Sequence, residues 1–492
     1  MMRADDGIDP IFVSAVLSER AAGRPRPTRG SATMRRPMVL PAVVAGAATL
    51  ALTACGGVGG GDDSDGGGDA QSGDLTADPS GSITTIGFAL PDEIATVRVD
   101  TFREMYPDVE VNINEGGFDE QQFLTSVSSG NPTELVYIPG DQVGAFAARG
   151  AIQPLDECIE QRDIDLGQYR PNVLDLVQYD GSTYAIPEFY NTPVLIVNNA
   201  VLAQAGLTAE DIDISDQESL LAAAQALTVR NGSTYERIGI HLRLPDLTPF
   251  YGVVDGNPWV AAADDFRLDD PATVATMERL KAVQDAQGGH TALKDFENTW
   301  DLFGEGNPFA QNQVGAMVIE QWYVNVLANT SPDVDITVLP ITDAGGETVT
   351  WATSNAWAIP KNADNTATSC EFMKIMTAPD TWAAAAEERI RLREAEGKAF
   401  TGIYTANEAA DDQVFGELYT PGTGENQKWD DAVQAVLEAQ SDAWVVPANP
   451  VGAQFKAAWL EATNRILAGT QDAESALAEA QDKVEQALAD VG

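Results

Sequence analysis

The sequence predicts an α/β fold of two lobes, each with a mainly parallel sheet flanked by helices. Two observations carry this prediction. Short apolar strands alternate with amphipathic helical segments along the chain, and this alternation places helices on the faces of a parallel sheet. In addition, residues 83–492 exceed the length that one hydrophobic core usually organises, so two lobes are expected.

The folded part opens with a βαβ unit. Residues 82–90 form a short apolar strand, and apolar residues then recur at helical spacing until Pro107 ends the helix. Residues 109–114 alternate apolar and polar side chains, as a strand does. Further strands are expected at 134–138, 193–198, 237–242, 314–319, 334–340 and 355–360. The chain ends in an amphipathic helix whose apolar face holds Ala473, Leu477, Ala480, Val484 and Leu488.

One of the three cysteines, Cys55, lies between an apolar segment and a segment rich in glycine and aspartate. Residues 34–54 begin with arginines and continue as an apolar run that ends in small residues, which is typical of a secretory signal. A transmembrane helix is disfavoured because the run is shorter than the roughly 20 apolar residues that span a bilayer. The sequence Leu-Thr-Ala-Cys at 52–55 resembles the bacterial lipobox, in which the cysteine is lipidated and becomes the mature N-terminus.

The segments around this signal follow from the same interpretation. Residues 55–82 are expected to be the lipidated cysteine and a flexible linker, because little in them can bury apolar surface. Stable anchoring takes more than one acyl chain, and bacterial lipoproteins carry several. Residues 1–33 are rich in arginine and proline without periodicity, so we interpret them as a non-native extension and place the translation start at Met34.

The formal net charge of −46 limits the partners of this protein. Nucleic-acid binding depends on Lys and Arg contacts to phosphate, so a nucleic-acid partner is not expected. The same charge disfavours lying flat on anionic lipid. We interpret the acidic residues as a solvated surface that maintains solubility.

The sequence contains no motif for catalysis, cofactor binding or metal binding. His241 and His290 are the two histidines, and zinc-protease, P-loop, nucleophile-elbow and dinucleotide-binding patterns are absent. We therefore expect a protein that is not an enzyme and has neither cofactor nor metal. The many carboxylates leave a secreted glycan hydrolase as an alternative.

Aromatic residues instead gather with amides and carboxylates beside Gly and Pro. Flat rings stack on the apolar faces of sugars, while amides and carboxylates hydrogen-bond to hydroxyl groups, so a sugar site combines both. Each cluster alone could be packing at a strand end, and the argument comes from their number. The clusters are at 187–192, 255–259, 320–325, 351–357 and 442–446.

Six stretches, taken in order, resemble the extracellular solute-binding proteins of carbohydrate ABC transporters, the maltose-binding-protein-like class. The most specific is YDGSTYAIPEFYNTPVLIVNNAVLAQAGL, which resembles the family segment where the chain crosses between lobes. NQVGAMVIEQWYVNVL resembles the strand that ends in a ligand-facing tryptophan, and WATSNAWAIPKNADNTATSCEFMKIMTAPDTW resembles the return crossing. The others are TFREMYPDVEVNI, NPTELVYIPGDQVGAFAARGAIQPLD and GTQDAESALAEAQDKVEQAL.

This resemblance implies a periplasmic-binding-protein-like fold whose two lobes close on a solute around a hinge. Lobe I would comprise 83–190 and 356–405, and lobe II would comprise 191–355 and 406–492. The protein would act as a monomer, bind a carbohydrate between the lobes and deliver it to the permease subunits of an ABC importer. A lipid anchor would raise its concentration near that permease.

The resemblance also implies ligand-binding residues. Trp322 falls at the family's stacking tryptophan, and Asp141 and Asp92 fall at acidic positions that follow strands. Ile138 and Gln142 depart from the aromatic and basic residues of maltose binders, which disfavours maltose itself. The remaining candidates are Tyr190, Asn191, Ser354 and Asn355, placed by motif, and Trp351, Trp259 and Trp444, placed more by composition.

Two points stay open in the sequence. Cys158 and Cys370 could form a disulfide in an extracytoplasmic compartment or remain two buried thiols. The resemblance assigns both segments to lobe I, which makes a bridge a reasonable hypothesis. The ligand could also be a polyol or a polyamine bound by the same fold, although few Lys and Arg residues disfavour anionic ligands.

Overall fold

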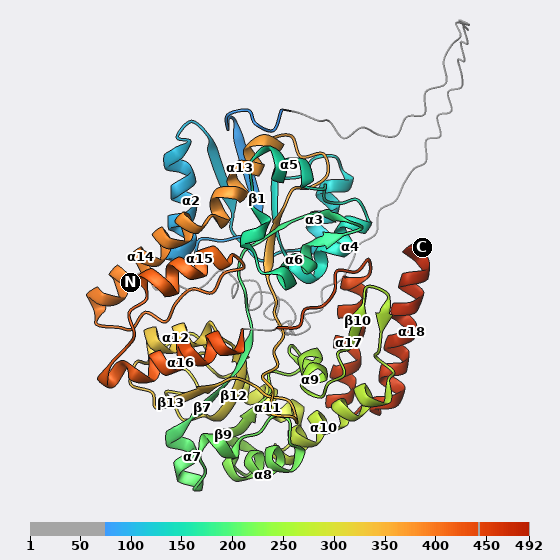
Figure 1. Cartoon of the computed structure of the whole chain (residues 1–492). Coiled ribbons are helices and arrows are strands. Elements are labelled where there is room, and N and C mark those ends of the chain that lie inside the picture. The colour runs from blue at the N-terminus through green and yellow to red at the C-terminus, as the bar shows by residue number, and fades with distance from the viewer. Residues whose placement is uncertain (1–73, 441–442, 492) are drawn as a thin grey trace, which may run out of the picture.

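The computed structural model describes residues 74–440 and 443–491. The predicted N-terminal extension, the signal, Cys55 and the linker up to residue 73 lie outside the described residues. Figure 1 shows two lobes, with the first sheet in the upper lobe and the second in the lower one. We call them lobe I and lobe II.

Lobe I is built on a five-stranded sheet of order β2-β1-β3-β14-β6. The first three of these strands are parallel, whereas β14 runs antiparallel to both of its neighbours. The strands are β1 (Ser82–Ile86), β2 (Glu110–Asn114), β3 (Leu135–Pro139), β6 (Ile186–Pro187) and β14 (Asn355–Ala358). β4 (Gln178–Tyr179) and β5 (Ser182–Thr183) form a separate small hairpin.

Helices flank this sheet and bury its main core. The side chain of Asp92 accepts a hydrogen bond from the Ala95 amide and so caps the first helix, which ends just before Pro107. The helices of lobe I are α2 (Glu93–Met105), α3 (Glu120–Ser128), α4 (Val143–Ala148), α5 (Asp156–Gln161), α6 (Pro171–Val177), α13 (Thr366–Thr377), α14 (Pro379–Glu396) and α15 (Glu408–Gln413). A smaller core lies between α2, α14 and α15. A disulfide joins Cys158 of α5 to Cys370 of α13, with Cα atoms 5.8 Å apart.

Lobe II is built on a second five-stranded sheet of order β13-β7-β12-β9-β8. Successive residues of β7 point into two different cores, Leu195 into one and Ile196 into the other, so both faces of the sheet are covered. The strands are β7 (Pro193–Asn198), β8 (Val229–Asn231), β9 (Thr234–His241), β12 (Val314–Glu320) and β13 (Ile336–Leu339). β10 (Val260–Ala262) and β11 (Asp265–Phe266) form a hairpin.

The helices of lobe II divide between the two faces of this sheet. Those that contribute to the larger core are α7 (Asn199–Ala205), α8 (Gln217–Leu227), α9 (Thr248–Val254), α10 (Pro271–Gln287), α17 (Gly452–Leu467) and α18 (Ala473–Val491). Those on the other side are α12 (Tyr323–Thr330) and α16 (Gln427–Ala439). α11 (His290–Glu297) packs against β9.

The fold confirms the two-lobed α/β prediction, and the strands lie where the sequence predicts them, within a few residues. The second sheet is more mixed than the expected parallel arrangement, because only β9 and β12 run parallel. The reason is the path of the chain. β7 leads away from the lobe junction and β12 leads back to it, so these central neighbours are antiparallel. No helix among residues 74–440 and 443–491 is long and apolar enough to cross a membrane.

Candidate functional site

Three chain segments lie side by side between the lobes and form a hydrogen-bonded junction. The segment before β7 pairs with the segment before β14, where the Asn191 amide donates to the Thr353 carbonyl at 2.9 Å. The third segment precedes α17, and its Trp444 amide donates to the Thr350 carbonyl at 3.0 Å. The Ala352 amide in turn donates to the Trp444 carbonyl at 2.8 Å. These bonds define the region where a solute would contact both lobes.

Gln321, at the end of β12, ties lobe II to this junction. The Thr192 amide donates to Gln321 Oε1 at 2.7 Å, and Gln321 Nε2 donates to the Tyr190 carbonyl at 2.6 Å. The Gln321 side chain is buried. The sequence analysis did not nominate this residue, although the EQW cluster that contains it was the available signal.

Tyr190 lies inside the junction. It is 1% exposed, and its hydroxyl accepts a hydrogen bond from Asn172 Nδ2 at 2.9 Å. The guanidinium of Arg170 lies 4.5 Å from the centre of its ring. The neighbouring predicted residue, Asn191, is also buried and bonds through its backbone. In this arrangement the Tyr190 ring supports the junction from lobe I and offers little surface to a ligand.

Trp322 lies two residues after β12 and is the N-cap of α12. Its ring stacks on Phe303, with ring centroids 6.2 Å apart and planes 29° apart, and meets the edge of Tyr323. It is 9% exposed. Trp322 therefore belongs to an aromatic cluster of lobe II, and it directly follows Gln321 of the junction.

Three predicted polar residues come together at the facing edge of lobe I. Asp141 follows β3, and the pairing of Asn355 with Pro139 places β14 beside it. The Gly140 amide donates to the Ser354 carbonyl at 2.7 Å, so Ser354 lies next to the same turn. Asp141, Ser354 and Asn355 thus occupy one edge, as a ligand site shared between lobes would require.

Asp141 also links the two lobes directly. Its carboxylate lies 3.3 Å from Lys456 Nζ on α17, and both side chains are partly exposed. The backbones approach closely beside this pair, because a Cβ atom on Gly144 would lie 2.7 Å from the Asn449 amide nitrogen. The lobes therefore meet through the Asp141–Lys456 ion pair and the close backbone contact of Gly144 with Asn449.

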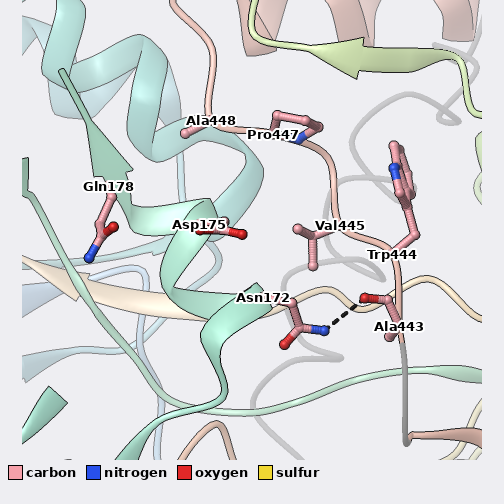
Figure 2. Close-up of a pocket in the computed structure, with 8 residues that line it drawn as sticks. All are labelled: Asn172, Asp175, Gln178, Ala443, Trp444, Val445, Pro447 and Ala448. Atoms are coloured by element: carbon pink, nitrogen blue, oxygen red, sulfur yellow. Dashed lines mark hydrogen bonds between the residues drawn. The ribbon is translucent and has the colours of Figure 1, made fainter. Parts of the chain in front are cut away.

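A pocket of about 480 Å³ lies between lobe I and the segment that precedes α17 (Figure 2). Asn172 Nδ2 donates to the Ala443 carbonyl at 2.8 Å across its wall. Trp444 is the predicted site residue that lines it. The lining residues are Asn172, Asp175, Gln178, Ala443, Trp444, Val445, Pro447 and Ala448.

The other two tryptophans predicted by composition belong to the core of lobe II. Trp351 is 8% exposed and lies beside Trp444, with ring centroids 6.4 Å apart. Trp259 is 0% exposed and packs edge-on against Trp459. Because Trp259 is completely covered, its expected ligand contact is not seen in this arrangement, and its ring serves packing.

Asp92 is engaged within lobe I. Its carboxylate caps α2 and forms an ion pair with Arg389 of α14 at 2.5 Å. Burial raises the pKa of Asp92, and the neighbouring Arg389 only partly opposes this shift. The expected ligand contact at Asp92 therefore competes with two intramolecular bonds.

Within the described residues, no group of three or more His, Cys, Asp or Glu side chains is arranged to hold a metal ion. His241 pairs with Glu297 through Nε2 at 3.1 Å, and its ring lies against Trp300. The arrangement offers stacking surfaces and hydrogen-bonding groups at a lobe junction, which is the chemistry of a binding protein.

Comparison with known proteins identifies the class. The family model for bacterial extracellular solute-binding proteins matches residues 98–392, more than half of the chain, and the protein belongs to this family. This confirms the resemblance drawn from the sequence. The maltotriose-binding protein of Pyrococcus abyssi is 24% identical over 135 residues, which span 27% of this chain and 29% of that relative.

Solved structures share the two-lobed fold. CpMnBP1 with mannobiose bound has a TM-score of 0.67 at 22% identity, covering 82% of this chain and 99% of that one. A solute-binding protein of an ABC transporter from Thermotoga lettingae, bound with α-D-tagatose, has a TM-score of 0.64 at 19% identity, covering 83% and 98%. The maltose/maltodextrin-binding domain from Bdellovibrio bacteriovorus, bound to maltotriose, has a TM-score of 0.61 at 16% identity. The match covers 83% of this chain and 99% of that one.

Proposed function

We propose that this protein is an extracytoplasmic receptor that binds a sugar or oligosaccharide between its lobes and delivers it to the permease of an ABC importer. The observation that carries the proposal is the junction itself, where the Asp141–Lys456 pair joins a polar edge of lobe I to lobe II, and where Gln321, next to Trp322, bonds to the junction backbone. Ligand contacts to both lobes would drive closure. The mannobiose and maltotriose bound to proteins of this fold support a saccharide ligand.

The proposed contacts divide by chemistry. Trp322 would stack on a sugar ring, and Asp141, Ser354 and Asn355 would bond to its hydroxyl groups. The Asp141–Lys456 pair supports a neutral ligand, because its charges offset each other while it offers both a donor and an acceptor. Trp444 would contact a ligand that extends toward the pocket.

The remaining parts of the proposal concern attachment and boundaries. Cys55 would carry the lipid anchor that keeps the receptor on the outer face of the cell membrane. Lobe I would comprise 83–190 and 356–405, and lobe II would comprise 191–355 and 406–492, except that α15 packs against α14 and so goes with lobe I. The receptor would act as a monomer. Bisacylation of Cys55, detected by mass spectrometry of the membrane fraction, would test the anchor.

A polyamine is the second candidate ligand, because the net charge of −46 favours cations. A thermal-shift screen with mannobiose, maltotriose, tagatose, polyols and spermidine separates the candidates, since a ligand that binds only the folded state raises the melting temperature. A saccharide hit supports the proposal, whereas a spermidine hit overturns the substrate class. Release of product from any glycan in the panel would contradict a receptor role.

A further inference from the structure

Arg170 lies immediately before α6 and reaches the tyrosine of the lobe junction. Its guanidinium carbon is 4.5 Å from the centre of the Tyr190 ring, a distance at which a cation is attracted to the ring face. The Arg170 side chain is 17% exposed, so water screens this contact only partly. Arg170 is thus the charged group that covers one face of the Tyr190 ring.

Asp411 of α15 holds Arg170 in this position. Arg170 Nη2 donates to Asp411 Oδ2 at 2.7 Å, and the Arg170 backbone amide donates to the Ala406 carbonyl at 3.0 Å. Asp411 itself is fixed, because its other oxygen accepts hydrogen bonds from the amide and hydroxyl of Thr405, both at 2.9 Å. The guanidinium therefore has little freedom to leave the tyrosine.

Tyr190, which Arg170 contacts, is also hydrogen-bonded to lobe II. Its carbonyl accepts from Gln321 Nε2 at 2.6 Å and from Gln440 Nε2 at 3.5 Å. Gln321 follows β12 and Gln440 follows α16, so both belong to lobe II. A displacement of the Tyr190 ring would move the carbonyl to which both glutamines bond.

We propose that Arg170, held by Asp411, is a positioning residue for solute binding: it fixes Tyr190 and thereby the arrangement of the two lobes. This inference rests on the proposed function for its affinity readout but not for its structural readout. A junction that is already ordered costs less to close on a ligand, so loss of the Arg170–Asp411 contact weakens binding.

Protonation of Asp411 breaks the same contact reversibly. Burial raises the pKa of Asp411 to about 6, against the opposing effect of Arg170. The other charged groups near this contact are Glu408, whose carboxylate lies 3.8 Å from Arg170, and Glu188, which is paired with Arg98 at 2.8 Å. Acidification below about pH 6 therefore removes the charge of the nearer carboxylate, Asp411, and leaves the more distant and more exposed Glu408.

The test compares pH 7.5 with pH 5.0 in the full chain by two measurements. Titration calorimetry with mannobiose gives the affinity, and small-angle X-ray scattering of the ligand-free protein gives the radius of gyration. The wild type is expected to bind about tenfold more weakly at pH 5.0, as loss of a partly buried cation–π contact implies, and to change its radius of gyration. Asp411→Asn should have the same affinity and the same radius of gyration at both pH values.

Matched variants complete the test. Asp412→Asn changes the exposed neighbour on the same helix and should keep the wild-type pH response. Arg170→Met should bind weakly at both pH values, and Arg170→Lys should recover part of the affinity because it keeps the charge. A pH response in Asp411→Asn equal to that of the wild type would overturn the proposal, as would wild-type affinity in Arg170→Met.

The two readouts separate the two proposals. If no saccharide of the panel binds, but the radius of gyration responds to pH in the wild type and not in Asp411→Asn, the saccharide proposal fails and the positioning role stands. If mannobiose binds and neither readout depends on Asp411, the positioning role fails. Should Arg170→Met not fold, Asp411→Asn and Arg170→Lys decide the outcome.

Discussion

The Trp322 ring stacks on Phe303 at 6.2 Å between centroids, and this contact joins a predicted ligand residue to a side chain that the sequence did not single out. Phe303 supports the ring from one side, while Tyr323 meets its edge. Both rings pack with the core of lobe II, and 9% of Trp322 remains exposed.

Trp322→Phe is therefore expected to weaken saccharide binding about tenfold, since an aromatic stacking contact contributes about 0.5–1.5 kcal/mol beyond area burial. Calorimetry with the saccharide found in the screen measures this change. Trp259→Phe is the matched control, because it shortens a fully buried tryptophan of the same lobe and should leave affinity within twofold. Equal losses in both variants would show that Trp322 acts only through packing.

Asp92→Asn is expected to lower the free energy of unfolding by about 2 kcal/mol, because the buried Arg389 loses one of its two carboxylate partners and keeps only Glu93. Saccharide affinity should change less than twofold. Chemical denaturation and calorimetry measure the two quantities. A large loss of affinity at unchanged stability would instead make Asp92 a ligand contact.

Removal of the disulfide by Cys158→Ser with Cys370→Ser is expected to cost about 2–5 kcal/mol of stability, since the bond closes a long loop between cysteines 212 residues apart. Denaturation of the wild type with and without reductant checks this. The stability of the double variant should be the same with and without reductant. Equal stability of wild type and variant under oxidising conditions would refute the stabilising role.

Glu297 should make stability depend on acid pH. Burial raises the pKa of Glu297, but the paired His241 and the neighbouring Lys294 lower it by more. The pKa of Glu297 therefore lies well below its ordinary value of 4.5. A lowered folded-state pKa stabilises the protein above pH 4.5, and this contribution is lost as pH falls below that value.

Glu297→Gln should accordingly be less stable than wild type at pH 7 and approach it at pH 3. The expected slope is about 1.4 kcal/mol per pH unit between pH 4.5 and the lowered folded-state pKa, where one proton separates the two states. Urea unfolding at several pH values measures the slope, with Glu278→Gln, an exposed acidic residue on α10, as the control. Parallel stability curves for Glu297→Gln and wild type would be the contrary result.

Much of the fold was predictable because local patterns determine it. The alternation in 109–114 and the apolar run in 193–198 became β2 and β7. The α2 cap at Asp92 depends on a residue three positions away. Such signals act within one element, where backbone geometry and side-chain periodicity suffice.

The candidate site was less predictable because its contacts join distant parts of the chain. Gln321 and Tyr190 are 131 residues apart, and Arg170 and Asp411 are 241 residues apart. Neither Gln321 nor Arg170 carries a local pattern that distinguishes it from an ordinary polar residue. Their roles depend on which segments the lobe junction brings together.

The sequence by itself determined the α/β class, the positions of most strands and an acidic protein without catalytic motifs. Only the tertiary structure decided which aromatic residues are covered: Trp259 lies inside the core of lobe II, whereas Trp444 lines a pocket. It also decided that β12 returns antiparallel to β7. Strand formation depends on neighbouring residues, but burial and strand direction depend on where distant segments pack.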